Sequence, residues 1–555
     1  VLLAIYFAVG ALAIECLAGG DAANKCTPDK CESVGNAQIC TDCQTGNVPI
    51  NGVCADATAS EANCKNKAGN GKADQTCEQC LNAYFMYKGG CYQTTQQPGQ
   101  SMCAGASDGK CDTPADGKTY FVVPGATKTD QSVVACGDTT GVTVDTNKKY
   151  VGVDGCAKCD APESLSAAGT ATATCTECNA NLYLKTVSSP TPTKSCVTEA
   201  ACKEGSTHFP TTDSSNGDKK VCVSCSQTSN GGIADCAKCS LTTSPAGAGA
   251  AVTCTECDST KKLSPLKDAC LDGCPAGTYE IGDTNKVCTP CHASCAECNN
   301  NANQDSCTAC YPGSVLSKGE TGNTGTCIPE CTGRYTENCE AGMCTAVLGG
   351  SKYCSKCKSG YVPVDGLCVS AGTRAAPNGC ISKGDGTCAS CTSTYFKESG
   401  GCYLSTAYPG KTLCSNAADG KCKTCTNGQT ADTSTGVCPA CPAGCSKCSG
   451  NSDPRTCSEC LAGYYKSGTS CVKCSENSNG IQGVPNCVSC KEPSSGSGPV
   501  TCYVTQEPTA DPTDPSTNKT GLSSGTIAGI SVAVIVVVGG LIGFLCWWFI
   551  CRGKA

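Results

Sequence analysis

The sequence has few of the residues from which globular cores and catalytic sites are usually built. Only two of its 555 residues are histidine, and aromatic residues make up 5% of the chain. Leu, Ile, Val and Phe together number 77, roughly 14%, whereas a globular core normally requires more than about 20%. Because apolar burial alone does not offset the conformational entropy of so long a chain, an ordinary large α/β enzyme is excluded.

An excess of basic charge is also missing. The chain has 41 basic and 48 acidic side chains, a formal net charge of −7, and this balance excludes a nucleic-acid partner. The two histidines, His208 and His292, lie in turn-like segments near cysteines, and the sequence contains no Gly-x-Ser-x-Gly elbow. We therefore expect no enzyme.

Cysteine is what the chain has in abundance. Its 60 cysteines exceed the level that indicates a disulfide scaffold, and Cys-x-x-Cys occurs eighteen times. Turn-forming residues separate these motifs, and short apolar runs such as 120–124 and 361–364 predict brief strands. The predicted fold is an elongated array of small disulfide-rich repeats made of short β-hairpins and loops, plus one transmembrane helix. Because each unit contacts mainly its neighbours, we expect a quasi-one-dimensional rod.

The two ends of the sequence predict the compartment. Residues 1–13 form a short apolar run that ends in a small-x-small pattern and resembles a signal peptide. Residues 526–550 form an uncharged stretch long enough to span a bilayer, and basic residues follow it at 551–555. We expect a single-pass type I protein of the plasma membrane with an extracellular face and a cytoplasmic C-terminus. Of the 60 cysteines, 58 lie between Cys16 and the span, enough for 29 disulfides.

Composition divides the predicted extracellular part of the chain, residues 14–525, into further regions; we call this part the exterior. Residues 14–270 are predicted to be an N-terminal cysteine-rich extracellular region, and 271–490 a region of repeats that resemble furin-like cysteine-rich repeats in the spacing described next. Residues 491–525 are rich in Pro, Ser and Thr and are predicted to be a juxtamembrane spacer. The Asn-x-Ser/Thr sequon at Asn518 lies in this spacer and is the predicted glycosylation site.

Two internal repeats align without gaps. The six cysteines of 288–310 match those of 438–460 at an offset of 150, with a spacing that resembles furin-like, or growth-factor-receptor-like, repeats. Residues 77–111 match 388–422 at an offset of 311, including a shared Gly-Gly-Cys-Tyr, although Cys425 has Pro114 as its counterpart. We expect these Gly-Gly-Cys-Tyr motifs to form tight turns in which tyrosine shields a disulfide. The predicted structural disulfide cysteines are Cys40, Cys43, Cys77, Cys80, Cys91, Cys388, Cys391, Cys402, Cys438, Cys441, Cys445, Cys448, Cys457 and Cys460.

Zinc binding is the alternative use of these cysteines, because paired thiolates at this spacing form closed metal sites. The strongest candidate segment combines four cysteines with an imidazole: Cys288, Cys291, His292, Cys295 and Cys298. Its repeat copy has Pro442 at the position of His292, which weakens the case. The oxidising exterior favours disulfides instead, so we expect no cofactor.

The complete architecture resembles the variant-specific surface proteins of Giardia. The most specific element of the resemblance is the terminal pentapeptide, made of Cys551, Arg552, Gly553, Lys554 and Ala555. The resemblance implies an antigen of a protective surface coat, expressed one type at a time for antigenic variation and immune evasion. It also implies palmitate on Cys551, where a cysteine beside a membrane span is an ordinary lipidation site.

The resemblance also suggests partners and leaves rivals open. The expected partners are the membrane, host antibodies, a host epithelial surface and neighbouring copies packed laterally, with no nucleic acid. The alternative functions are a surface adhesin or receptor for a host ligand, and a zinc-binding surface protein.

Overall fold

The computed structural model describes residues 16–17, 19–35, 37–187, 192–242, 251–319, 322–372, 379–450 and 455–506. The predicted signal (1–13), the predicted span (526–550), the tail (551–555) and Asn518 all lie outside these ranges. Inside them, no helix combines the length and the apolar character needed to cross a membrane.

Short strands dominate the described chain, as the sequence predicted. The strands contain two to six residues, and the α-helices of the described part are α1 (Gly99–Met102) and α2 (Glu199–Lys203). The two apolar runs expected to be strands are β11 (Tyr120–Val122) and β34 (Tyr361–Val364). Many connecting turns place Gly, Asn or Asp at positive φ, which reverses the chain after a few residues and keeps the strands short.

Four sheets share one strand order. In each, two hairpins lie side by side and the inner strands of the two hairpins pair in parallel. The first sheet contains β4 (Val53–Asp56), β3 (Asn47–Ile50), β8 (Gly90–Gln93) and β7 (Tyr84–Tyr87). The second contains β19 (Thr193–Val197), β18 (Tyr183–Val187), β21 (Lys219–Ser224) and β20 (His208–Asp213). The third contains β25 (Cys270–Leu271), β24 (Lys262–Leu263), β27 (Val287–Pro290) and β26 (Thr278–Ile281). The fourth contains β35 (Leu367–Ser370), β34, β39 (Gly401–Leu404) and β38 (Tyr395–Glu398).

A second recurring unit is a hairpin in which one Cys-x-x-Cys strand faces another. Cysteines stand opposite each other at the open end, as in Cys156↔Cys178 and Cys445↔Cys460, and a β-bulge shifts the register inside each hairpin. The four hairpins are β15 (Cys156–Asp160) with β17 (Thr174–Cys178), β22 (Cys236–Leu241) with β23 (Val252–Cys257), β28 (Cys295–Cys298) with β29 (Cys307–Cys310), and β42 (Cys445–Ser449) with β43 (Thr456–Cys460).

Buried residues form small separate clusters, each built from a few apolar side chains and the disulfides beside them. The largest fully buried side chains are mainly aromatic, among them Tyr92, Tyr353, Tyr403 and Phe396. A few aromatic rings thus fill the modules of a chain that is poor in aliphatic residues. Each core is small enough that the disulfides have to supply much of its order.

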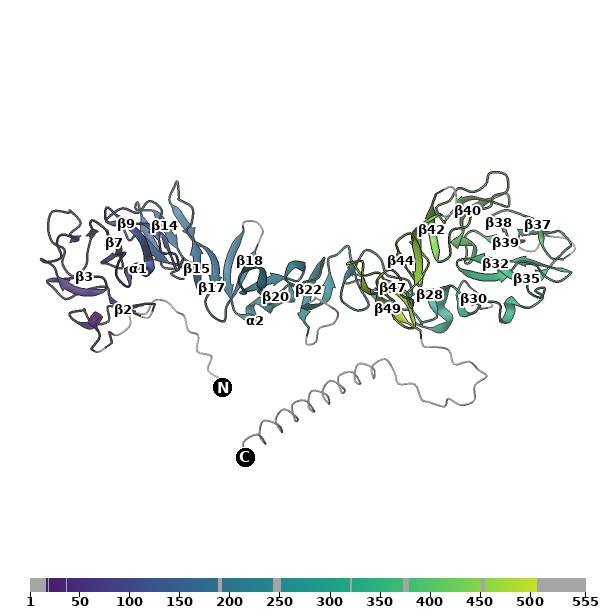
Figure 1. Ribbon diagram of the computed structural model, residues 1–555, viewed down its shortest axis with the longest axis horizontal. Coiled ribbons are helices and arrows are strands. Elements are labelled where there is room, and N and C mark those ends of the chain that lie inside the picture. The colour runs from purple at the N-terminus through teal and green to yellow at the C-terminus, as the bar shows by residue number, and fades with distance from the viewer. Residues whose placement is uncertain are drawn as a thin grey trace, which may run out of the picture.

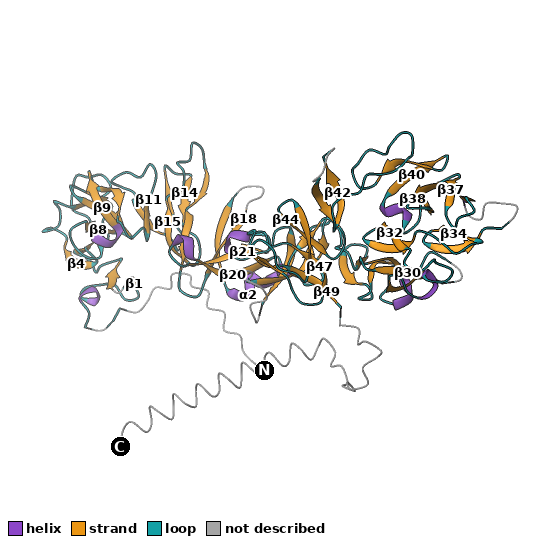
Figure 2. Cartoon of the chain, turned by 45° about the vertical axis from the view of Figure 1, so that its right-hand side comes forward, coloured by secondary structure: helices purple, strands orange, loops and turns teal. Residues whose placement is uncertain are grey.

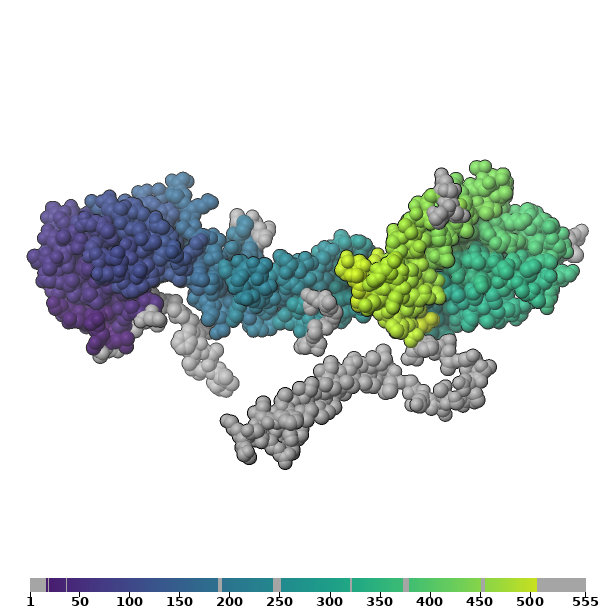
Figure 3. Space-filling view, viewed as in Figure 1, coloured from purple at the N-terminus to yellow at the C-terminus, as the bar shows by residue number. Residues whose placement is uncertain are grey.

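The molecule is elongated, but it is not a simple rod. The chain runs from one end, with β3 and β7, to the other end, with β35 and β38, and then returns toward the middle (Figure 1). A view turned by 45° shows the same arrangement, with β44 (Tyr464–Ser467) and β47 (Cys487–Lys491) beside the central modules (Figure 2). In the space-filling view, the last described segment lies against residues near 280 (Figure 3).

Specific contacts hold this fold-back. Lys411 Nζ lies 2.9 Å from a Glu297 carboxylate oxygen, across 114 positions of sequence. Gly277 approaches Val504 so closely that a Cβ on the glycine would lie 3.3 Å from Val504 Cγ2. In the C-terminal half, modules therefore contact distant modules as well as their sequence neighbours, which the expected quasi-one-dimensional rod does not include. The reason is that a few ordinary side chains make these distant contacts, with no periodic pattern to reveal them.

Candidate functional site

The disulfide network is the most extensive chemical feature of the molecule. Twenty-nine disulfides pair the 58 cysteines from Cys16 to Cys502, which is the number that the even count of exterior cysteines allows. The sequence separations run from 7 to 23 residues. Each bond is therefore local, and the network is a succession of small closed loops.

The two cysteines of every Cys-x-x-Cys motif bond to different partners. Each motif is thus a junction between two disulfide loops, and neither a vicinal redox pair nor a chelating thiol pair. The structure places the predicted structural cysteines in the bonds Cys26–Cys40, Cys43–Cys54, Cys64–Cys77, Cys80–Cys91, Cys380–Cys388, Cys391–Cys402, Cys425–Cys438, Cys441–Cys448, Cys445–Cys457 and Cys460–Cys471.

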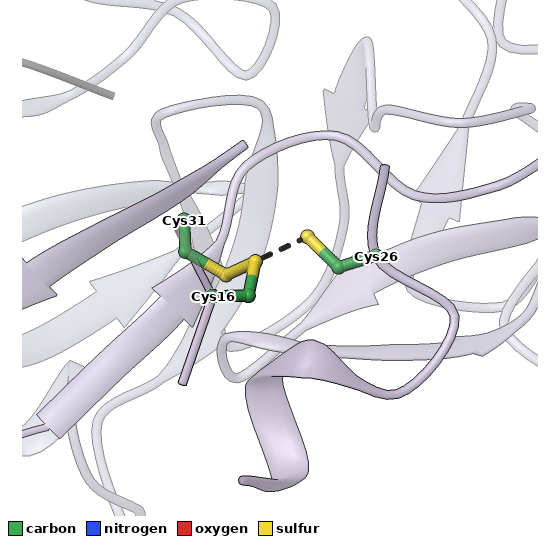
Figure 4. Close-up of side chains that lie close together, drawn as sticks. All are labelled: Cys16, Cys26 and Cys31. Atoms are coloured by element: carbon green, nitrogen blue, oxygen red, sulfur yellow. Dashed lines mark hydrogen bonds between the residues drawn. A yellow bond between two sulfur atoms is a disulfide. The ribbon is translucent and has the colours of Figure 1, made fainter. Parts of the chain in front are cut away.

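Neighbouring disulfides also stack on one another. Cys31 Sγ, bonded to Cys16, lies 3.8 Å from Cys26 Sγ of the next disulfide (Figure 4). Similar contacts of 3.5 to 3.7 Å join Cys354 to Cys368 and Cys254 to Cys270. The clusters of three sulfurs that have the dimensions of a metal site are these stacked disulfides.

The zinc candidates do not fit a metal. Cys288 is bonded to Cys274, and Cys295 to Cys307. Cys291 and Cys298 are bonded to each other, so all four sulfurs of the candidate segment lack the negative charge of a thiolate ligand. The remaining candidate, His292, forms a 2.8 Å hydrogen bond between its Nδ1 and Ser294 Oγ. The donor set therefore does not correspond to a zinc site.

The two histidines are far from a hydrolytic arrangement. His208, on β20, has its Nδ1 2.8 Å from Thr207 Oγ1, and burial and the nearby Lys185 both lower the pKa of its imidazole. His292 lines an open groove of about 680 Å³ that also contains residues of the returning C-terminal segment. Among the described residues, neither ring is hydrogen-bonded to a carboxylate, so the arrangement of a Ser-His-Asp triad is not present in this part of the chain.

Both Gly-Gly-Cys-Tyr motifs form the predicted turns. Gly89 and Gly400 have positive φ angles of 73° and 83°, and the strands β8 and β39 begin at the next residue. Tyr92 and Tyr403 are fully buried, and burial raises the pKa of both phenols. Among the described residues, each hydroxyl is buried without a hydrogen-bond partner. The rings pack against Phe85 and Phe396 with centroid separations of 6.1 and 6.2 Å, in buried clusters that also contain the Cys103–Cys111 and Cys414–Cys422 disulfides.

The internal repeat around these motifs is larger than the gap-free match indicated. We call residues 16–111 the N-terminal twin and 331–422 the C-terminal twin. Their sheets have the same strand order, and a cis peptide precedes Pro98 in one and Pro409 in the other. Each twin has six disulfides, and they correspond in order. Those of the N-terminal twin are Cys16–Cys31, Cys26–Cys40, Cys43–Cys54, Cys64–Cys77, Cys80–Cys91 and Cys103–Cys111. Those of the C-terminal twin are Cys331–Cys344, Cys339–Cys354, Cys357–Cys368, Cys380–Cys388, Cys391–Cys402 and Cys414–Cys422.

A change of offset concealed the longer repeat. The fourth loop separates its cysteines by 13 positions in the N-terminal twin and by 8 in the C-terminal twin. A shared Val-Pro followed by Gly-x-Cys, at 48–54 and 362–368, was the available signal. Cys425, which lacks a counterpart, bonds onward to Cys438, so the copies continue differently. In Figure 1 the twins occupy opposite ends of the molecule.

Comparison with known proteins agrees with this architecture. The family model described as Giardia variant-specific surface protein matches residues 10–201, 188–423 and 416–555. The chain is 32% identical to the major surface-labeled trophozoite antigen 417 of Giardia intestinalis, covering 94% of this chain and 95% of the relative. It is 29% identical to the variant-specific surface protein VSP4A1 of the same organism over the full length of both, and 30% identical to the surface antigen CRP170 over 46% of this chain and 79% of that protein.

No solved structure matches the chain. These three relatives are named as surface antigens or surface proteins, which supports a location at the cell surface. With a family model that matches nearly the whole sequence and a relative aligned along almost its full length, this chain belongs to the Giardia variant-specific surface protein family.

Proposed function

We propose that this variant surface antigen acts as a disulfide-stapled shield on the cell surface, and that its exposed loops are the part that host antibodies meet. The observation that carries the proposal is the split of every Cys-x-x-Cys between two disulfide loops. A protease that cuts one loop leaves both ends attached to the neighbouring modules. A coat built from such chains keeps its shape after a single cut inside a disulfide loop, and loop sequences are free to change while the bonds stay in place.

The attachment of the shield is a further part of the proposal. An apolar span at 526–550, followed by Arg552 and Lys554, supports a single-pass type I anchor with its tail in the cytoplasm. The position of Cys551 directly after the span supports lipidation there. The sequon at Asn518 supports glycosylation of the spacer between the last disulfide and the membrane.

The shield acts without catalysis in this proposal. The support is that neither histidine is hydrogen-bonded to a carboxylate in the part of the chain that the structure describes, and that the relatives are named as surface antigens or surface proteins. Binding of a host ligand remains the rival function. An adhesin would bind cells through the purified exterior, whereas a shield would resist degradation without binding them.

The test compares proteolysis of the purified exterior before and after reduction. The native protein should lose intact mass slowly, and fragments produced by a cut inside a disulfide loop should separate only when reductant is added to the gel sample. The reduced and alkylated protein should lose its fold and be digested at least tenfold faster, because the disulfides no longer restrict the unfolded chain. A sample treated with the alkylating reagent alone is the control. Equal half-lives for the native and reduced proteins would contradict the shield.

A further inference from the structure

One group of sulfurs at the N-terminal end forms a continuous series rather than isolated bonds. Three disulfides make up the series, which we call the sulfur relay: Cys16–Cys31, Cys26–Cys40 and Cys43–Cys54. Cys31 Sγ is 3.8 Å from Cys26 Sγ, and Cys40 Sγ is 3.4 Å from Cys54 Sγ. Each disulfide is thus in contact with the next one, and the sulfurs of each junction lie within 4.8 Å of one another.

Burial decides at which end of the relay a small thiol in solution can attack. Cys26, Cys31, Cys40 and Cys43 are all buried, with exposed fractions of at most 5%. Cys16 and Cys54, at the two ends of the relay, are both half-buried, but Leu17 beside Cys16 has an exposed fraction of 69% and Val53 beside Cys54 one of 39%. A small thiol in solution therefore has access to the first disulfide through Cys16 and not through its partner Cys31.

We propose that Cys16 is an S-thiolation site for a low-molecular-weight thiol, and that the relay passes the displaced sulfur inward by thiol–disulfide exchange. The thiolate of the small molecule forms a bond to Cys16 Sγ and breaks the Cys16–Cys31 bond, which releases the thiolate of Cys31. That thiolate attacks Cys26 Sγ, forms Cys26–Cys31 and releases Cys40. Attack of Cys40 on Cys54 Sγ forms Cys40–Cys54 and releases Cys43.

Atoms and charges balance over the sequence. One small thiol is consumed, one mixed disulfide appears on Cys16, and two new internal disulfides replace two old ones. The proton of the small thiol ends on Cys43, which remains as a neutral buried thiol because burial disfavours the thiolate. No external oxidant is needed, since the three disulfides already hold the oxidising equivalents.

Proximity favours exchange inside the relay over attack by a second small thiol. The displaced thiolate of Cys31 lies in van der Waals contact with the next disulfide, so its attack is unimolecular. At the second junction, Cys40 Sγ is closer to Cys54, at 3.4 Å, than to Cys43, at 4.0 Å. Cys43 is therefore the leaving group. The consequence is that a reductant meeting this end of the coat protein leaves two of its three disulfides closed.

Disulfide mapping tests the relay directly. The full exterior, 14–525, is treated with one equivalent of reduced glutathione, quenched with acid, denatured, and alkylated with N-ethylmaleimide under mildly acidic conditions that halt exchange. Peptide mass spectrometry should then find glutathione on Cys16 and N-ethylmaleimide on Cys43 in most of the singly modified molecules. New peptides linked by Cys26–Cys31 and Cys40–Cys54 should accompany them. N-ethylmaleimide on Cys31 with the other two bonds intact would overturn the relay, and glutathione on Cys54 instead of Cys16 would overturn the modification site.

A double variant isolates the middle bond. Cys26→Ser/Cys40→Ser removes it while leaving Cys16–Cys31 and Cys43–Cys54 in place. Glutathione should still modify Cys16 in this variant, but N-ethylmaleimide should now be found on Cys31 and not on Cys43. Labelling of Cys43 in the double variant would show that it is reduced independently and would overturn the inward transfer. Because the wild-type mapping is decisive by itself, the proposal stays testable if the variant folds poorly.

Discussion

Asn51 and Asp365 occupy the same turn of the two twins, and only one of them is ionisable. Both have a φ of 49°. The Asn51 side-chain oxygen accepts a 2.8 Å hydrogen bond from the backbone N–H of Gln93, and the Asp365 carboxylate accepts one of 2.8 Å from Leu404. Asn51 also donates from its amide to Gln96, whereas a carboxylate has nothing to donate. Burial raises the pKa of Asp365, so the turn is less favourable to an ionised side chain.

Replacing Asp365 with asparagine should therefore stabilise the C-terminal twin. A carboxyl whose folded pKa is raised makes the fold less stable as pH rises from the ordinary value of 3.8 through the folded pKa. Asp365→Asn removes that loss. We expect a gain on the order of 1 kcal/mol at neutral pH, which shrinks as the pH falls through the folded pKa toward 3.8 and is absent below that value. Thermal unfolding of the exterior as a function of pH measures the difference.

Asp385 supplies the opposite control in the same twin. It is exposed, and hydrogen bonds from Thr387 and Lys383 lower the pKa of its carboxyl to about 2. Asp385→Asn should give no gain at neutral pH, because the ionised form is the favoured one there. An equal increase in stability from both substitutions would show that burial at Asp365 is not the cause.

A second prediction concerns the effect of the Tyr403 hydroxyl on stability. Tyr403→Phe removes a buried polar group that has no partner, so its stability should lie within about 0.5 kcal/mol of the wild type or above it. Tyr403→Ala should cost about 3 to 5 kcal/mol, because it empties the centre of an aromatic cluster. Denaturant unfolding with the disulfides intact provides both values.

Tyr335 is the matched control for the hydroxyl. Its OH donates a 2.7 Å hydrogen bond to the backbone oxygen of Leu316. Tyr335→Phe leaves that carbonyl oxygen without its partner and should cost about 1 kcal/mol. If Tyr403→Phe were the more damaging of the two, the Tyr403 hydroxyl would have a partner after all.

Gly109 allows steric and conformational costs to be separated. Its φ is 79°, and a Cβ at this position would lie closer than 3.0 Å to the carbonyl oxygen of Cys80. Gly125 has nearly the same φ of 77° but open space within 4 Å. Gly125→Ala should cost about 1 kcal/mol through the backbone alone, and Gly109→Ala should cost clearly more. Comparable costs in unfolding experiments would contradict the close packing of this turn.

Features that depend on local chemistry were the most predictable from the sequence. The brief strands and the Gly-Gly-Cys-Tyr turns depend on short stretches of sequence, and the structure agrees with both. Disulfide connectivity could not be predicted, because the close spacing of successive cysteines leaves many equally short closures open. The choice among them depends on which cysteine faces which across each bulged hairpin, as in Cys156, which stands opposite Cys178 but bonds to Cys175.

The fold-back could not be predicted from the sequence, for a different physical reason. Its contacts join segments more than one hundred positions apart, such as Glu297 and Lys411, which are separated by 114 positions, and use single side chains without a repeated motif. The longer twin repeat was detectable in principle from the Val-Pro pairs at 48–49 and 362–363, but the shorter fourth loop changed the offset. The zinc candidates failed because the spacing of Cys288, Cys291 and Cys295 does not reveal which cysteines they bond to.

The fold-back itself is open to a direct test at Val504. This side chain has an exposed fraction of 7% and packs beside Gly277, where the returning segment meets the central modules. Val504→Asp would bury a carboxylate without a partner at this junction, at a cost of roughly several kcal/mol. We expect the returning modules to separate from the centre, and the maximum dimension measured by small-angle X-ray scattering to increase.

Val347→Asp is the control for this change, because Val347 has an exposed fraction of 57% and its substitution places the same charge in water. The disulfides inside each module are local, so both variants should keep their bonds, and non-reducing peptide mapping checks this. An unchanged maximum dimension in Val504→Asp, with its bonds intact, would mean that other contacts such as Lys411 with Glu297 are sufficient to hold the modules together. An increase in both variants would instead indicate a general effect of added charge. The contact between Val504 and Gly277 would then not be what holds the returning modules against the centre.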